Sequence, residues 1–285
     1  MQNEKVQSEW DIIVKSKTGL FDLKLKEIYQ YKDLIWLFVK RNYSTRYKQM
    51  ILGPAWIIIT PLFTILTYSI VFGGIAGLST DGIPKPLFYL AGTIIWGFFS
   101  SGVISNSNTF TNNAGLFGKI YFPRMVVPLS TMITLFFDFC VQFFLMLLLL
   151  AFYAYRGINI VWNWTVIFLP LYLLQIGLLA MGVGIIVSSL TTKYRDLGVL
   201  INFGLQIWMY ASPVIYSITL IPQRYRQWFM FNPVTPVILA FKYSFLGIGE
   251  ISYGFWGISW IITLLTLFGA IILFNQVEKN FMDTV

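Results

Sequence analysis

The chain contains the stretch VVPLSTMITLFFDFCVQFFLMLLLLAFYAY at Val126–Tyr155, in which Asp138 is the only charged residue. About 20 apolar residues in helical conformation are enough to cross the hydrocarbon core of a bilayer. The whole chain of 285 residues has the same character, since 57% of its residues are hydrophobic and 11% are charged. A soluble domain has about 25% charged residues. The sequence therefore predicts an all-α protein that crosses a membrane several times.

Five further stretches are apolar and long enough to cross a bilayer. The six predicted spans are Leu52–Ile75, Leu87–Ile104, Val126–Tyr155, Trp162–Leu190, Leu197–Tyr216 and Tyr253–Phe274. The stretch Trp228–Phe241 is too short to cross, and prolines interrupt it, so we expect re-entrant or interfacial helices there on the outer side. The chain thus divides into a polar N-terminal arm, residues 1–50, and a six-span membrane domain, residues 51–285.

Lys and Arg residues predict the orientation, because cytoplasmic segments retain them. An even number of spans places both termini on one side. With both termini in the cytoplasm, the inner segments hold fifteen of the 20 Lys and Arg residues. We therefore expect a multi-pass protein of the bacterial inner membrane, and the net charge of +8 reflects its orientation in lipid rather than nucleic-acid binding.

The composition excludes several kinds of chemistry. The chain has no histidine, which rules out imidazole acid–base catalysis and His-ligated metal sites. The one cysteine, Cys140, cannot form an internal disulfide, and its apolar surroundings predict a packed small hydrophobe. No metal site is expected.

The end of the N-terminal arm predicts an amphipathic helix lying along the cytoplasmic interface. One helical face can carry its apolar side chains, Tyr31, Leu34, Ile35 and Phe38. The cationic heads expected near anionic lipid are Lys40, Arg41, Arg46 and Lys48. A simple N-terminal extension of the first span is the alternative, but Gly53 and Pro54 favour a break between the two.

Three stretches go beyond general membrane composition. The first is DLIWLFVKR at Asp33–Arg41, followed by LGPAW at Leu52–Trp56; the second is GKIYFPR at Gly118–Arg124. The third opens with YRDL at Tyr194–Leu197 and continues through SPVIY at Ser212–Tyr216 to Asn232 and Pro233. In this order and spacing they resemble the membrane subunit of polysaccharide-exporting ABC transporters, the permeases for O-antigen, teichoic acid and capsule. One position departs: where that family often has an arginine, this chain has Lys242.

The resemblance implies a homodimeric permease that lies in membrane lipid and moves a lipid-linked glycan outward. Each copy is paired with a separate ATPase subunit in the cytosol. The chain lacks the Gly-x-x-x-x-Gly-Lys-Ser/Thr loop that cradles nucleotide phosphates. ATP and Mg are therefore expected in the partner subunit, and this chain is expected to have neither a cofactor nor a catalytic site.

The second inner loop is predicted to couple the permease to its ATPase. A short helix there could insert aromatic rings into a groove of the partner, with cations at the rim and a proline ending the helix. These residues are Phe117, Lys119, Tyr121, Phe122, Pro123 and Arg124. A surface loop whose Lys and Arg only set the topology is the alternative.

Aromatic side chains can stack on sugar rings, so some are predicted to line a glycan conduit. The candidates are Trp56, Tyr68, Phe72, Trp96, Trp208 and Tyr210. At the outer end, two short helices separated at Asn232 and Pro233 are expected to plug this conduit, hinged at Pro213 and Tyr216.

Asp138 is the lone acid inside a predicted span, and such residues are functional candidates. A proton relay needs further titratable groups at that depth, which the sequence does not supply. A structural hydrogen bond to a Ser, Thr or Tyr of a neighbouring helix is favoured.

Two other functions remain open. A membrane glycosyl- or acyltransferase of the lipid-linked sugar pathway would need a cluster of acids or a histidine, which is not seen. A related permease that exports a lipid or a drug would differ in its substrate rather than in its machinery.

Overall fold

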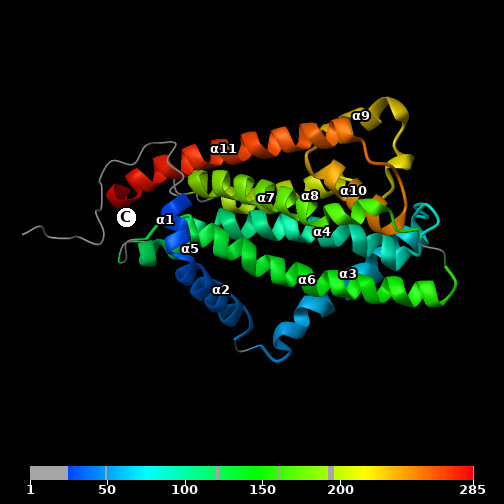
Figure 1. Ribbon diagram of the computed structural model, residues 1–285, viewed down its shortest axis with the longest axis horizontal. Helices are drawn as coiled ribbons and strands as arrows, with labels where there is room; N and C mark the ends of the chain where they lie inside the picture. The colour runs from blue at the N-terminus through cyan, green and yellow to red at the C-terminus, as the bar shows by residue number, and fades with distance from the viewer. Residues whose placement is uncertain are drawn as a thin grey trace, which may run out of the picture.

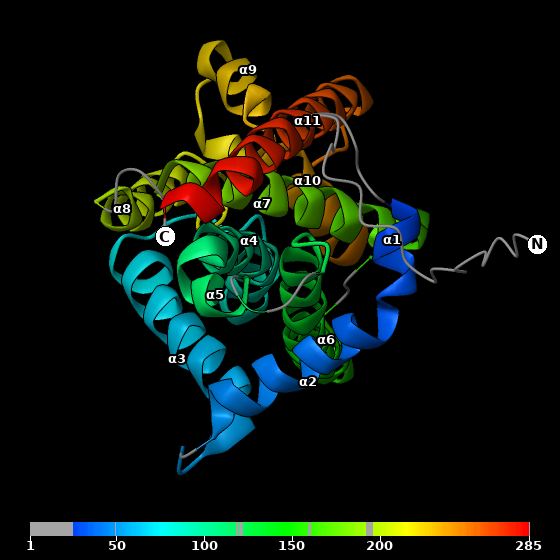
Figure 2. The same ribbon diagram turned by 90° about the vertical axis from the view of Figure 1, so that its left-hand side faces the viewer.

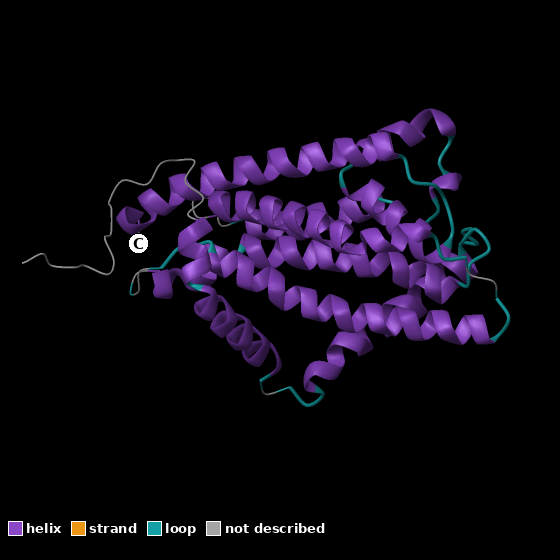
Figure 3. Ribbon diagram, viewed as in Figure 1, coloured by secondary structure: helices purple, strands orange, loops and turns teal. Residues whose placement is uncertain are grey.

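The computed structural model describes residues 25–48, 50–117, 119, 122–158, 161–191 and 196–284, with side chains from residue 27 to residue 277. Throughout this part the chain forms helices and loops without strands (Figure 3). The all-α membrane fold predicted from composition is confirmed. The longer helices run side by side along the long axis of the molecule (Figure 1).

The α-helices follow one another in a simple order, joined by short 3-10 and π turns. They are α1 (Leu25–Gln30), α2 (Lys32–Tyr47), α3 (Trp56–Ile70), α4 (Lys85–Ser107), α5 (Thr109–Phe117), α6 (Val126–Tyr155), α7 (Leu169–Thr191), α8 (Leu197–Tyr210), α9 (Gln223–Phe231), α10 (Val234–Leu246) and α11 (Tyr253–Thr284). The break predicted between α2 and the first span is present, because Gly53 takes a positive φ of 46° and Pro54 begins a new helical turn.

Within the described residues, five helical segments are long and apolar enough to cross a membrane. They are Gly53–Ile75, Lys85–Ser107, Val126–Tyr155, Trp164–Thr191 and Tyr253–Val277, close to five of the six predicted spans. The predicted fifth span, Leu197–Tyr216, is helical only in α8, which ends at Tyr210 after 14 residues. Such a helix is about 21 Å long, shorter than a hydrocarbon core of about 30 Å. The count of six spans therefore stays a prediction.

Helices α9 and α10 form a bent pair at the position predicted from the sequence. Their axes differ by 106°, and the break falls at Asn232 and Pro233. Pro233 is the N-cap residue of α10, where its missing backbone N–H breaks no hydrogen bond of the helix. Residues of α10 are buried almost throughout, whereas α9 is largely exposed. The pair supplies a sixth crossing only when both helices are taken as one span.

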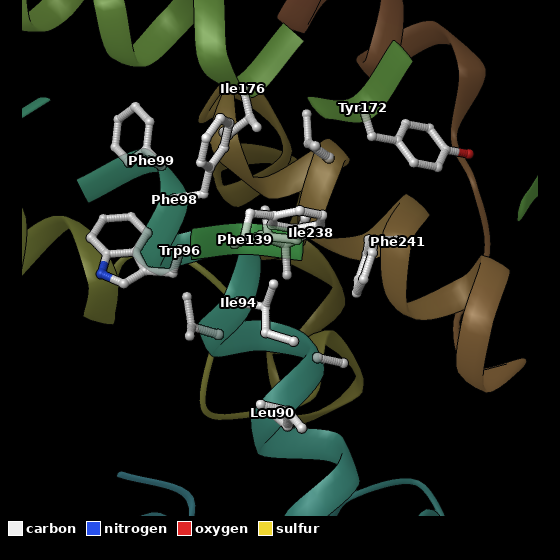
Figure 4. Close-up of a cluster of buried hydrophobic side chains, with 14 of the residues drawn as sticks. Leu90, Ile94, Trp96, Phe98, Phe99, Phe139, Tyr172, Ile176, Ile238 and Phe241 are labelled. Carbon is white, nitrogen blue, oxygen red and sulfur yellow. The ribbon is translucent and has the colours of Figure 1, made fainter. Parts of the chain in front are cut away.

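Helix α4 is the centre of the bundle, surrounded by α3, α6 and α7 (Figure 2). In its most apolar window 72% of the residues are buried, against 6% for the first span. Figure 4 shows Ile94, Trp96 and Phe99 of α4 within the buried cluster, which also includes Tyr172 of α7 and Phe241 of α10.

Close backbone contact fixes the pair of α4 and α7. A Cβ atom added at Gly184 of α7 would lie 2.6 Å from the Cβ of Asn106 and 2.9 Å from the carbonyl oxygen of Val103. Small residues at such contacts let membrane helices approach closely.

The peripheral helices instead expose large apolar side chains, as expected for a lipid-facing surface. Cys140 of α6 is exposed too, so the prediction of a buried thiol is wrong.

Replacement of Gly92 by alanine should destabilise the protein. A Cβ atom at Gly92 would overlap the backbone carbonyl oxygen of Val214, which cannot move as a flexible side chain does. Gly97, one turn further along α4, has open space at the same position and is the matched control. We expect Gly92→Ala to cost about 1–3 kcal/mol and to lower the melting temperature of the detergent-solubilised protein, with Gly97→Ala unchanged or higher. Equal melting temperatures for the two variants would contradict the packing described here.

Candidate functional site

An ion pair joins α2 to α6, between a partly exposed arginine and a buried aspartate. Nη1 of Arg46 donates to Oδ2 of Asp138. Asp138 is the thirteenth residue of α6, about 18 Å along the helix from its start. A charge at such a position in a membrane protein is stable only when it is paired or hydrated. Tyr47 lies beside the pair, and burial together with the charge of Asp138 raises the pKa of its hydroxyl, which therefore remains neutral.

Sequence reasoning missed Arg46 as the partner of Asp138. It expected a neutral hydrogen bond from a Ser, Thr or Tyr, and it placed Arg46 with the cationic heads at the lipid surface. Helix α2 instead packs against α6, and Arg46 in its last turn reaches Asp138. The other carboxylate oxygen, Oδ1, has no hydrogen-bond partner among the described residues.

The apolar face of α2 packs against protein rather than lipid. Phe38 is 4% exposed, and its ring lies 5.6 Å from that of Phe122. Tyr31, Leu34 and Ile35 pack against the same cluster. Lys40 is exposed, as expected of a cationic head at the interface.

The predicted coupling loop has a different arrangement from the one expected. The side chains of Phe117 and Phe122 are 3% and 4% exposed and pack in one cluster with Phe110 and Phe274, so the prediction that they are presented to a partner is wrong for this structure. The guanidinium of Arg124 lies 5.3 Å from the ring centre of Phe117.

The other predicted coupling residues differ from one another in the exposure of their side chains. Lys119 is exposed and Pro123 is buried. Tyr121 lies outside the described residues. The aromatic rings therefore brace the loop on α2, α5 and α11, and exposed groups such as Lys119 are left for an external contact.

Three cavities follow one another between α2, α3, α4 and α6. The inner cavity, of about 600 Å³, is lined by Arg41, Asn42, Thr45, Arg46, Ile104, Ser105, Asn108, Thr109, Asn112, Asn113, Val127, Thr131, Thr134 and Leu135. The middle cavity, of about 330 Å³, is lined by Arg46, Tyr47, Met50, Trp56, Ile57, Thr60, Asp138 and Gln142. The aromatic cavity, of about 260 Å³, is lined by Trp56, Ile57, Thr60, Pro61, Thr64, Tyr68, Thr93, Trp96, Gly97, Ser101, Gln142 and Met209.

Neighbouring cavities share walls. Arg46 lines both the inner and the middle cavity. The middle and aromatic cavities share four residues: Trp56, Ile57, Thr60 and Gln142. A series of spaces thus leads from the polar end of α5, past the ion pair, to a chamber of aromatic rings and hydroxyl groups.

The structure brings half of the predicted conduit residues together. Trp56, Tyr68 and Trp96 all line the aromatic cavity. Phe72 packs on Tyr68, with ring centres 5.3 Å apart, and does not line the cavity itself. Trp208 and Tyr210, on α8, do not line the cavity, although Met209 between them does. The ring of Trp208 lies 5.1 Å from that of Phe99, on the next layer of α4.

The four residues predicted for the outer gate lie in one hydrogen-bonded cluster. The side chain of Asn232 accepts from Nε1 of Trp208 at 2.9 Å and donates to Oγ of Ser212 at 2.8 Å. The carbonyl oxygen of Pro233 accepts from Oγ of Ser259 at 2.6 Å, which ties the break between α9 and α10 to α11. The hydroxyl of Tyr216 donates to the carbonyl oxygen of Tyr210 at 2.9 Å.

Lys242 completes this cluster from inside the protein. It is 2% exposed, and its Nζ donates to the carbonyl oxygens of Pro213 at 2.8 Å and Val214 at 3.1 Å. The same ammonium lies 3.9 Å from the ring centre of Phe88. A buried cation needs such partners, and here it fixes the turn after α8 against α10 and α4.

Metal chemistry finds no support in the described part of the chain. It contains no group of three His, Cys, Asp or Glu side chains that could hold a metal ion.

Comparison with known proteins gives consistent results. The chain is 26% identical over 252 residues to the O-antigen export system permease protein RfbA of Klebsiella pneumoniae, covering 88% of this chain and 94% of that protein. It is 26% identical to the polysialic acid transport protein KpsM of Escherichia coli, over 86% of this chain and 93% of that protein. It is 24% identical to the inner membrane transport permease YadH of Escherichia coli K12, over 85% of this chain and 91% of that protein.

Residues 33–246 match the family described as ABC-2 type transporter. The matched residues make up more than half of the chain. The match begins at the helix that carries Arg46 and ends with α10, so it includes the three cavities and the outer cluster. This chain therefore belongs to the membrane-protein family of ABC-2 type transporters.

Proposed function

We propose that this chain is the permease of an ABC transporter that exports a lipid-linked polysaccharide across the bacterial inner membrane. Two copies of the chain act with two copies of a separate ATPase subunit, which binds ATP and Mg. Membership of the ABC-2 type family and the likeness to O-antigen and polysialic acid permeases support this function. The chain itself performs no catalysis.

The aromatic cavity is the observation that carries the proposal. Its rings, Trp56, Tyr68 and Trp96, offer flat apolar faces to the CH groups of a sugar. Its hydroxyl and amide groups can exchange hydrogen bonds with sugar hydroxyls. They come from Thr60, Thr64, Thr93, Ser101 and Gln142. Such a mixed lining suits a glycan that must move through without being held tightly.

Export of a lipid or a drug is the second candidate, because the chain is also similar to the permease YadH, whose name specifies no substrate. The polar groups in the aromatic cavity favour a glycan over a wholly apolar molecule. A membrane glycosyltransferase is disfavoured by membership of a transporter family.

The proposal assigns a side of the membrane to each end of the molecule. Both termini and the loop after α5 face the cytoplasm and the ATPase, in accordance with the distribution of Lys and Arg. The outer cluster around Asn232 and Lys242 closes the path outward between transport cycles. Its many hydrogen bonds make it a firm closure that a conformational change must break.

Inactivation of the gene tests the function directly. Surface polysaccharide should disappear while lipid-linked glycan accumulates on the inner leaflet, because synthesis continues without export. Both can be measured by immunoblotting of surface glycan and by extraction of the lipid-linked pool, with the wild-type gene on a plasmid as the control. Normal surface polysaccharide in the inactivated strain would contradict the proposal.

The coupling loop can be tested by loosening its aromatic brace. Phe122→Ala removes a buried ring that packs on Phe38 and Phe117, and such truncations cost about 3–5 kcal/mol. We expect weaker co-purification of the ATPase subunit and slower permease-dependent ATP hydrolysis in reconstituted vesicles. Phe144→Ala is the matched control, since Phe144 is 61% exposed on α6. Unchanged association and hydrolysis in Phe122→Ala would leave this loop with a topological role only.

A further inference from the structure

The loop between α3 and α4 contains a tight turn that carries an acid. Residues 80–83 close with a hydrogen bond of 3.1 Å from the backbone N–H of Ile83 to the carbonyl oxygen of Thr80. Both central residues have a positive φ, 52° at Asp81 and 81° at Gly82, which is the pattern of a type I′ turn. Asp-Gly and Asn-Gly both favour this turn. The backbone therefore requires a short polar residue before the glycine, but it does not require a negative charge.

The carboxylate of Asp81 binds the segment that follows α8. Its Oδ2 accepts from the hydroxyl of Ser217, and its Oδ1 accepts from Oγ1 of Thr219 at 3.1 Å. Oγ of Ser217 also accepts from the backbone N–H of Thr219 at 3.2 Å and so begins the 3-10 turn Ile218–Leu220. Ser217 is 5% exposed and Asp81 is half-buried. Because hydrogen bonds to a charged acceptor are stronger than those between neutral groups, this one side chain holds two positions of the segment.

Lys242 holds the same segment at its other end. Its Nζ donates to the carbonyl oxygens of Pro213 and Val214, and the carboxylate of Asp81 attracts this ammonium. We call residues 213–219 the outer strap. A buried cation of α10 fixes the start of the outer strap, and an anion of the α3–α4 loop fixes its end.

The loop that carries Asp81 continues from α3, which lies at the edge of the bundle (Figure 2). Of the residues of α3, Ile57 and Ile65 are buried in the described structure, and the others are partly or largely exposed. The helix ends in a π turn, Val71–Ile75, and π turns occur mostly at functional sites. Packing within the chain therefore holds α3 less firmly than it holds the other long helices.

Helix α3 also forms one wall of the aromatic cavity. Half of the lining residues lie on it: Trp56, Ile57, Thr60, Pro61, Thr64 and Tyr68. Trp96 of α4 and Met209 of α8 line the same cavity. A glycan of several sugars is larger than this cavity of about 260 Å³, so its entry has to move α3 away from α4 and α8. Because the α3–α4 loop follows α3 directly, this movement pulls Asp81 away from the outer strap.

We propose that Asp81 is a latch of the outer strap and a positioning residue for export. While α3 packs against α4, the carboxylate holds the strap closed. When a glycan enters the aromatic cavity and displaces α3, the carboxylate leaves Ser217 and Thr219, and the strap is free to open. This inference rests on the proposed function, and it links occupancy of the cavity to opening on the outer side.

The latch can be tested without a glycan. The full chain, purified with its ATPase subunit, is reconstituted in vesicles that contain the pH indicator pyranine, and the proton leak is measured after an acid pulse without ATP. Asp81→Asn keeps the turn, but it removes the charge, and its amide nitrogen cannot accept from a hydroxyl. We expect its leak to exceed that of the wild type about tenfold or more, because a hydrogen bond to a charged group shifts an equilibrium by about that factor.

Three further variants separate the latch from a general effect on folding. Thr219→Val keeps the shape of the side chain, removes a hydroxyl that binds Asp81 and should leak as well. Glu250→Gln removes an exposed acid between α10 and α11 and should stay as tight as the wild type. Gly184→Ala disturbs the contact with Asn106 near the other end of α4, so it should lower the melting temperature without a leak.

A covalent tether tests the link to transport. Cys140, the only cysteine of the chain, is replaced by serine, and Asp81→Cys and Thr219→Cys are joined by a short bifunctional methanethiosulfonate. In spheroplasts the tethered complex should keep its ATPase subunit but stop exporting newly made polysaccharide. Reduction cleaves the tether and should restore export.

The inference is overturned by equal leaks of wild type, Asp81→Asn and Thr219→Val, or by leaks of Glu250→Gln or Gly184→Ala as large as that of Asp81→Asn. Normal export by the tethered complex also overturns it. Each of these results leaves the proposed function intact, because that is tested separately by gene inactivation. A leak that depends on the carboxylate, in a permease whose loss leaves surface polysaccharide normal, would instead refute the function and keep the latch.

Discussion

An arginine and an aspartate pair where α2 crosses α6, and the packing of α2 on the helix bundle depends on that contact. Arg46 lies in the last turn of α2, and Asp138 lies well inside α6. The buried carboxylate of Asp138 is not stable alone among apolar helices, so its pairing with Arg46 fixes α2 against α6. The pair forms the wall between the inner and middle cavities and thereby determines how α2 covers them.

The buried Lys242 has the corresponding role toward the other end of the molecule. Lys242 binds the backbone after α8, and Asn232 binds the same turn from the break between α9 and α10. Specific polar contacts therefore hold the bundle at two levels, in addition to its apolar packing. Polar contacts can be exchanged for others during a conformational change, which suits a transporter that must open to each side in turn.

Much of the fold could be predicted from the sequence, because the need to bury backbone groups in lipid leaves few alternatives. Val126–Tyr155 was predicted as a helix with the bounds that the structure gives, and the break at Asn232 and Pro233 was placed correctly. The length of α8 was not predicted, because its end at Tyr210 depends on long-range contacts of Ser212 and Pro213 with Asn232 and Lys242.

The candidate site was predictable only in part. Trp56, Tyr68 and Trp96 were among the aromatic candidates, but composition could not separate them from Trp208 and Tyr210, since helix phase decides which side chains meet. The burial of Phe117 and Phe122 was missed because their partners, Phe38 and Phe274, are distant in sequence. The one available signal for the ion pair was an uncompensated acid in a span.

The pairing of Arg46 with Asp138 is tested most directly by an exchange of the two charges. The variants Arg46→Asp and Asp138→Arg, alone and together, are compared for protein level in the membrane and for surface polysaccharide. Each single variant leaves like charges facing each other and should lose about 3 kcal/mol of stability and most of its export, and the double variant should recover a substantial part of both. Single variants that export as well as the wild type, or a double variant with the summed defects of the two, would contradict the account.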